Sequence, residues 1–323
     1  MFQTRTFALP DGEVITFGDT RQGEADTRPV LLLLPGQKRL PPGQLSGDFI
    51  AEQVDFLLPE FRVIMWNYRF NDYPGEKINI PRLAQDLVAF LAAEKIDQVC
   101  LYGYSYGGMV AIRLASLVPQ KIKAMVLLNA FPYLSFTWFG FNRITLRFLL
   151  HLSVIPSNVS SHIRESMYPS FRQHPNGYHG IIGRFCNWLS HHALDTIWIH
   201  IWSPRIWSAL KDDVRPLLPS ITAPTLILGG RADAACSLES AREFKQGLPN
   251  SQLEVLDSAG HYTVRIWPES FNRPIRSFLV QQYGLPETAM PIPHRTPPAP
   301  MPAVRLLRTL VVQYWEWLRS RFR

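Results

Sequence analysis

The sequence predicts an α/β fold in which a mostly parallel sheet is flanked by helices, and two observations carry this prediction. Short apolar runs bounded by proline or glycine, such as 30–34, are typical of buried parallel strands. These runs alternate with segments of helical periodicity, such as 83–94. Such alternation places helices on both faces of a parallel sheet.

The predicted elements follow in a regular order. The chain opens with a hairpin, 5–9 and 13–17, because Asp11-Gly12 is a strong hairpin signal. Further strands are predicted at 30–34, 61–66, 99–102, 124–128, 224–228 and 252–256. Helices are predicted at 83–94, 106–118, 237–247 and 268–282. The alternation is interrupted between 131 and 211, which indicates an inserted segment.

The domain organisation follows from this interruption and from composition. A chain of 323 residues can form one large α/β core with an insert and a tail. We expect the core at 1–130 and 212–285 and a mainly helical cap at 131–211. Seven prolines indicate a stiff, extended linker at 286–302, and a basic amphipathic helix is expected at 303–323.

Composition and charge exclude several classes. Apolar residues make up 46% and charged residues 18%, so a buried core is expected. The net charge is +7, but 131–211 carries +5 and 286–323 carries +4, which leaves a slightly acidic core. A nucleic-acid reader usually has a basic stripe on its core, so no nucleic-acid partner is expected.

The sequence gives weaker indications of location and metal binding. The three cysteines are widely spaced, and no apolar stretch reaches the length of a membrane span. We therefore expect a cytoplasmic protein, with peripheral membrane contact as an alternative. No histidine or cysteine spacing is typical of a metal site, so no metal and no cofactor is expected.

A serine nucleophile is the strongest chemical prediction. Ser105 lies in Gly103-Tyr104-Ser105-Tyr106-Gly107, between a predicted strand and a predicted helix. An alcohol must be exposed and deprotonated in order to attack, and a sharp strand-to-helix turn with small flanking residues exposes it. The alternative is a glycine-rich turn in which Ser105 has no chemical role.

These residues resemble the α/β-hydrolase superfamily with a serine nucleophile and an inserted cap domain. The resemblance covers 5–130 and 215–282, and its motifs lie at 103–108, 229–233 and 260–261. It implies an α/β-hydrolase fold and a catalytic triad in the order nucleophile, acid, histidine. The residues in that order are Ser105, Asp233 and His261.

Each of the other two triad members has an alternative reading. His261 follows a predicted strand and would take the serine proton as general base, but it could also be a surface histidine. Asp233 would orient the imidazole, but it could also cap the helix that begins near Ser237. Some relatives carry the acid after the preceding strand, where this chain has the uncharged Asn129.

An oxyanion hole requires two N–H donors. We assign one to the backbone of Tyr106, directly after the nucleophile, and the other to Gln37, with Gly36 as the alternative. Many relatives have His-Gly in this second loop, whereas the present chain has Pro35-Gly36.

The cap and the tail indicate partners. The range 131–211 contains fifteen aromatic residues, which favours an apolar acyl substrate, although these residues could simply hold the cap together. The helix at 303–323 has one apolar and one arginine-rich face, which suits an anionic membrane surface or docking on a second copy or on the protein itself. We expect hydrolysis of a carboxylic ester or thioester through an acyl-enzyme on Ser105. Acyl transfer by the same triad and a non-catalytic binding protein are the alternatives.

Overall fold

The computed structural model describes residues 2–36, 54–69, 79–133, 211–231, 233, 236–256 and 268–286. All of these residues belong to one compact unit, Met1–Ser135 and Ile199–Pro291. Several sequence predictions lie outside the described residues: His261, Gln37, nearly all of the cap, and the linker and tail beyond 286.

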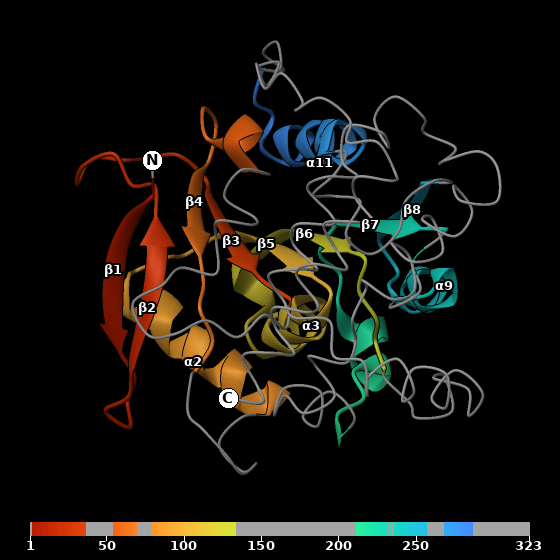
Figure 1. The fold of residues 1–323 in the computed structure, drawn as a ribbon, viewed down its shortest axis with the longest axis horizontal. Helices are drawn as coiled ribbons and strands as arrows, with labels where there is room; N and C mark the ends of the chain where they lie inside the picture. The colour runs from red at the N-terminus through yellow and green to blue at the C-terminus, as the bar shows by residue number, and fades with distance from the viewer. Residues whose placement is uncertain are drawn as a thin grey trace, which may run out of the picture. The chain divides into compact units, whose positions relative to one another are not determined.

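The described core is an eight-stranded sheet in the order β1-β2-β4-β3-β5-β6-β7-β8 (Figure 1). The strands are β1 Gln3–Ala8, β2 Val14–Asp19, β3 Val30–Leu34, β4 Arg62–Met65, β5 Val99–Tyr104, β6 Ile122–Leu128, β7 Thr225–Gly230 and β8 Ser251–Leu256. Strands β3 to β8 are parallel, whereas β2 is antiparallel to both β1 and β4. The predicted α/β class and the opening hairpin are confirmed.

Helices cover both faces of this sheet, as the alternation predicts. The α-helices are α2 Ile80–Ala93, α3 Tyr106–Leu117, α9 Leu238–Gly247 and α11 Pro268–Tyr283, and 3-10 turns lie at η2 Asp55–Leu57, η3 Pro119–Lys121 and η6 Arg215–Ser220. In Figure 1, α11 lies on one face, and α2, α3 and α9 lie on the other. Within the described part of the chain, no helix is long and apolar enough to cross a membrane.

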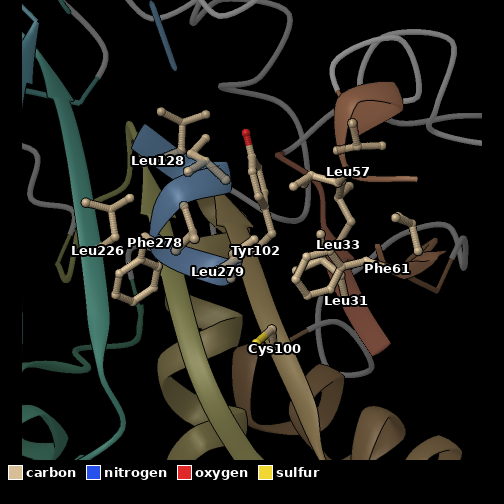
Figure 2. Close-up of a cluster of buried hydrophobic side chains, with 14 of the residues drawn as sticks. Leu31, Leu33, Leu57, Phe61, Cys100, Tyr102, Leu128, Leu226, Phe278 and Leu279 are labelled. Carbon is tan, nitrogen blue, oxygen red and sulfur yellow. The ribbon is translucent and has the colours of Figure 1, made fainter. Parts of the chain in front are cut away.

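The central strands are buried on both faces because helices cover both. Every residue of β5 is buried, and the inner residues of β3 have no solvent exposure. On the α11 side, Phe278 and Leu279 pack against strand residues that include Leu31 and Tyr102 (Figure 2). Burying this much aliphatic and aromatic surface is the main favourable contribution to the stability of such a core.

The hairpin is joined to the rest of the core by buried ion pairs. Asp19, at the end of β2, accepts hydrogen bonds from Nη2 of Arg62 at 2.7 Å and from Nη1 of Arg5 at 2.8 Å. Burial alone would raise the pKa of Asp19, but the two guanidinium groups outweigh it and lower that pKa below its ordinary value. Arg69 binds Asp86 of α2 through two parallel hydrogen bonds, and its Nη1 also donates to Asp11 in the hairpin turn at 2.7 Å.

Several element boundaries differ from the prediction by one to three residues, and two of these differences have a clear local cause. Strand β5 continues to Tyr104 rather than ending at Tyr102, because its ladder with β6 extends through the pair Tyr104 and Leu128. Helix α2 begins at Ile80 rather than at 83, because the side chain of Asn79 accepts a hydrogen bond from the Arg82 N–H and caps the first turn. The first difference places the end of the strand directly before Ser105.

Candidate active site

Ser105 forms the junction between β5 and α3. Its backbone has φ 54° and ψ −120°, a conformation that residues other than glycine rarely adopt. The Ser105 N–H donates to the Leu128 carbonyl at 3.0 Å, and the Ser105 carbonyl accepts from the Gly108 N–H at 2.9 Å. The predicted sharp turn is therefore present, and hydrogen bonds on both sides hold it in this strained conformation.

Close approach of backbone to backbone explains the glycines on either side. A Cβ atom at Gly107 would lie 2.1 Å from the Leu34 carbonyl oxygen, and one at Gly103 would lie 2.8 Å from the Gly107 oxygen. Such contacts cannot be relieved by rotating a side chain, because the opposing atoms belong to the main chain. The amino terminus of α3 thus packs directly on the end of β3, as the turn requires.

The described part of the predicted oxyanion hole lies beside the nucleophile. Tyr106 is the first residue of α3, where the backbone N–H groups point out of the helix along its axis and favour negative charge. A Cβ atom at Gly36 would lie 3.4 Å from the Ser105 Cβ, so the loop after β3 approaches the serine closely. The structure therefore brings together Ser105, Tyr106 and Gly36, whereas Gln37 lies outside the described residues.

Asp233 lies just after β7 and is 6% exposed. Its N–H donates to the Gly230 carbonyl at 3.2 Å, and its Oδ1 accepts from the Cys236 N–H at 2.7 Å. The capping role considered as an alternative for Asp233 belongs instead to Ser237, whose side chain accepts from the Ser240 N–H. The carboxylate is thus held in a buried turn at the carboxyl edge of the sheet.

Cys236 is a site residue that the sequence interpretation missed. It is 3% exposed, and its Sγ lies 3.9 Å from the Ser105 Oγ. Since its N–H also binds Asp233, this one residue contacts both the predicted nucleophile and the predicted acid. Its position three residues after Asp233 was the available signal, but a lone cysteine in an apolar sequence suggests a packing residue.

Asn129 is a second residue whose role differs from the one considered. It follows β6 with φ 45°, is buried, and its Oδ1 accepts from the Gly230 N–H at 3.2 Å. Its own N–H donates to the Leu228 carbonyl at 2.9 Å. Asn129 therefore fastens the end of β6 to the end of β7, immediately before the turn that carries Asp233.

Strand β8 precedes the predicted base in the sequence. The ladder between β7 and β8 ends with the pair Gly230 and Leu256, at the same edge of the sheet as Ser105 and Asp233. His261 follows Leu256 by five positions in the sequence and lies outside the described residues. Among the described residues, no cluster of histidine, cysteine and acidic side chains could hold a metal ion.

Comparison with known proteins places this architecture in a family. A model of the alpha/beta hydrolase family matches residues 24–276. A curated relative from Serratia proteamaculans, named "Putative carbamate hydrolase RutD", is 24% identical over 254 residues, covering 73% of this chain and 87% of the relative.

Solved structures have the same fold. A hydrolase from Pseudomonas aeruginosa superposes with a TM-score of 0.59 at 22% identity, covering 86% of this chain and 98% of the other. An esterase from Exiguobacterium antarcticum superposes with a TM-score of 0.58 at 22% identity, covering 86% and 99%. The family match, the sheet order and the strained turn at Ser105 agree, and the chain is therefore a hydrolase that belongs to the alpha/beta hydrolase family.

Proposed function

We propose that this chain is a serine hydrolase that cleaves a carboxylic ester or thioester with an apolar acyl group. The observation that carries the proposal is the strained φ of Ser105 at the junction of β5 and α3, with the buried Asp233 carboxylate on the neighbouring loop. A buried carboxylate held by a backbone N–H is suited to orient an imidazole.

The proposed reaction has two steps. The Ser105 Oγ attacks the substrate carbonyl carbon and His261 accepts the serine proton. The N–H of Tyr106 and the N–H of Gln37, or alternatively of Gly36, stabilise the oxyanion. The bond to the alcohol or thiol breaks, and the leaving group takes that proton from His261. Water, deprotonated by His261, then attacks the acyl-enzyme, and Ser105 recovers its proton as the acid departs.

The apolar acyl preference rests on the sequence. The aromatic residues of 131–211, the segment in which relatives carry a cap, favour an apolar substrate portion. The name of the Serratia relative adds carbamates to the substrates worth testing, since a carbamate presents the same carbonyl with a nitrogen substituent. Acyl transfer to an alcohol remains the alternative reaction, because the same acyl-enzyme serves both.

The proposal is tested with p-nitrophenyl esters of increasing acyl length, a thioester and a p-nitrophenyl carbamate. Ser105→Ala removes the nucleophile, and Ser116→Ala is the matched control, because Ser116 lies near the other end of α3 with its hydroxyl bonded to the Arg113 carbonyl. We expect turnover that rises with acyl length, is lost in Ser105→Ala and is unchanged in Ser116→Ala.

Two results would contradict parts of the proposal. Equal turnover by Ser105→Ala and wild type would exclude the serine mechanism. Turnover of the carbamate with no turnover of any ester or thioester would replace the proposed substrate class. Adding an alcohol acceptor separates transfer from hydrolysis, since a transferase forms a new ester at the expense of the free acid.

A further inference from the structure

Tyr68, which lies just beyond β4, contacts both sides of the predicted oxyanion hole. It is 4% exposed, and its Oη donates a hydrogen bond to the Pro35 carbonyl at 3.0 Å. Its ring meets the Tyr106 ring edge-on, with centroids 5.8 Å apart and an interplanar angle of 85°. One contact thus reaches the loop after β3, and the other reaches the residue that follows the nucleophile.

The hydrogen bond to Pro35 has a direct consequence for the loop. We take Gly36, the alternative to Gln37, as the second oxyanion donor. The Pro35 carbonyl and the Gly36 N–H belong to the same planar peptide unit, so fixing the direction of one fixes the direction of the other. A donor at the carbonyl also polarises the peptide and strengthens its N–H as a donor. Pro35 itself has a restricted φ, which limits the ways in which the loop could otherwise rearrange.

The loop and the helix are already close at this point. A Cβ atom at Gly107 would lie 2.8 Å from the Pro35 oxygen, the same oxygen that accepts from Tyr68. The Pro35 carbonyl therefore lies between the start of α3 and the Tyr68 hydroxyl. The edge-on contact with Tyr106 attaches Tyr68 to α3 as well, because aromatic pairs in this geometry attract one another. Tyr68 therefore links the loop after β3 to the start of α3 through its hydroxyl and its ring.

We propose that Tyr68 is a positioning residue for the oxyanion hole: it sets the orientation of the Pro35–Gly36 peptide relative to the Tyr106 N–H through its hydroxyl and its ring. This inference rests on the proposed function, because an oxyanion hole matters only if Ser105 attacks a carbonyl. Two N–H groups stabilise an oxyanion well only when both point at the same oxygen. A small rotation of the loop therefore reduces the stabilisation of the transition state more than it reduces the affinity for substrate.

The test compares Tyr68→Phe, which removes the hydroxyl and keeps the ring, with Tyr68→Leu, which removes both. Direct loss of one oxyanion donor lowers kcat by about 10²–10³, so we expect loss of a positioning hydroxyl to lower it by about tenfold with little change in KM. The kcat of Tyr68→Leu should fall further, because the ring contact with Tyr106 is removed as well. Rates are measured with p-nitrophenyl esters.

A second readout reports on the oxyanion hole itself. An alkylboronic acid forms a bond from boron to the Ser105 Oγ, and the serine proton passes to His261, which leaves a tetrahedral borate anion. Its affinity should fall in Tyr68→Phe by the same factor as kcat, while inhibition by a neutral alcohol of the same chain length, which carries no oxyanion, should not change. If Tyr68 only stabilised the fold, kcat and boronic acid affinity would not fall by the same factor while the inhibition constant of the neutral alcohol stayed unchanged.

Tyr283→Phe is the matched control. The Tyr283 hydroxyl accepts a hydrogen bond from the Cys100 Sγ at 3.8 Å, and its ring meets Phe61 edge-on with centroids 5.9 Å apart. Both partners lie near the amino ends of their strands, whereas the site lies at the carboxyl ends. We therefore expect Tyr283→Phe to change stability without changing kcat or the boronic acid affinity.

The outcomes separate the two proposals. Active Ser105 chemistry with equal kcat and equal boronic acid affinity in wild type and Tyr68→Phe would overturn the role of Tyr68 alone. An equal fall of kcat in Tyr68→Phe and Tyr283→Phe would also overturn it, since general loosening would explain both. A wild type that neither turns over esters nor binds the boronic acid would overturn the proposed function, and the role of Tyr68 with it.

Discussion

The Sγ of Cys236 lies 3.9 Å from the Oγ of Ser105, although 131 positions separate the two residues in the sequence. The backbone N–H of Cys236 binds the Asp233 carboxylate. The turn that carries the predicted acid is therefore in contact with the predicted nucleophile. A thiol is a weak hydrogen-bond partner, so it fills the space beside Ser105 without competing strongly for the hydroxyl proton.

Replacing Cys236 by serine tests this weak competition. A hydroxyl binds the Ser105 hydroxyl more strongly than a thiol does, so we expect Cys236→Ser to lower kcat by about tenfold, a cost of about 1.4 kcal/mol. Cys236→Ala keeps the N–H that binds Asp233 and should retain more activity than Cys236→Ser. Ester kinetics on both variants make this comparison. A kcat lower in Cys236→Ala than in Cys236→Ser would show that the sulfur contributes directly.

Substituting Gly107 by alanine should disrupt the turn. The new Cβ would lie 2.1 Å from the backbone oxygen of Leu34, so β3 and α3 would have to separate, at a cost of about 3 kcal/mol. We expect a lower urea midpoint and loss of ester turnover. Gly23→Ala is the control: that glycine has φ 80° with nothing near its Cβ position, so it tests backbone strain alone. Equal stability of the two variants would contradict this account.

Asn129 should support catalysis through the acid loop. Asn129→Ala leaves the buried Gly230 N–H without its side-chain acceptor, which should cost about 1–3 kcal/mol and lower kcat more than it changes KM. Lys95→Ala is the control for placing alanine at a positive φ, because Lys95 has a similar φ of 53° and lies beyond the end of α2. Thermal unfolding and ester kinetics on both variants provide the comparison. A kcat in Asn129→Ala as high as in Lys95→Ala would show that Asn129 does not support catalysis.

Asp19 should make the protein less stable in acid. Because its folded pKa is lowered below the ordinary 3.8, its ionised form stabilises the fold above that pH, and this contribution is lost as the pH falls through the lower folded pKa. Asp19→Asn should therefore reduce the loss of unfolding free energy between about pH 5 and about pH 2. Urea unfolding across this range measures the slope. Asp97→Asn, at a carboxylate that is 96% exposed, should retain the wild-type slope.

The central strands could be predicted well because they are short and buried on both faces. The run 30–34, for example, contains no polar residue and lies between Pro29 and Pro35. Helix α2 begins three residues before the apolar periodicity does, with Asn79 as its cap and Pro81 in its first turn, as in many helices. The order of the motifs predicts Ser105 as the nucleophile and Asp233 as the acid. The structure places both residues at the same edge of the sheet.

The contacts that complete the site could not be predicted in the same way. Cys236 and Tyr68 are apolar or aromatic residues whose sequence neighbourhoods suggest packing, and their partners are distant in the sequence. From the sequence, Asn129 is only an uncharged residue where some relatives carry the acid. Its hydrogen bond to Gly230 depends on the pairing of β6 with β7, which the sequence alone does not specify. Such roles arise from tertiary geometry, and periodicity carries no information about them.

The central claim is that Ser105 is the nucleophile, and covalent labelling tests it most directly. A fluorophosphonate loses fluoride as a P–O bond forms to an activated serine, which adds one phosphonyl group to the protein. Mass spectrometry of the intact protein, followed by peptide mapping, should find one adduct on Ser105 in the wild type and none in Ser105→Ala. An adduct that persists in Ser105→Ala, or a wild type that remains unlabelled, would contradict the account.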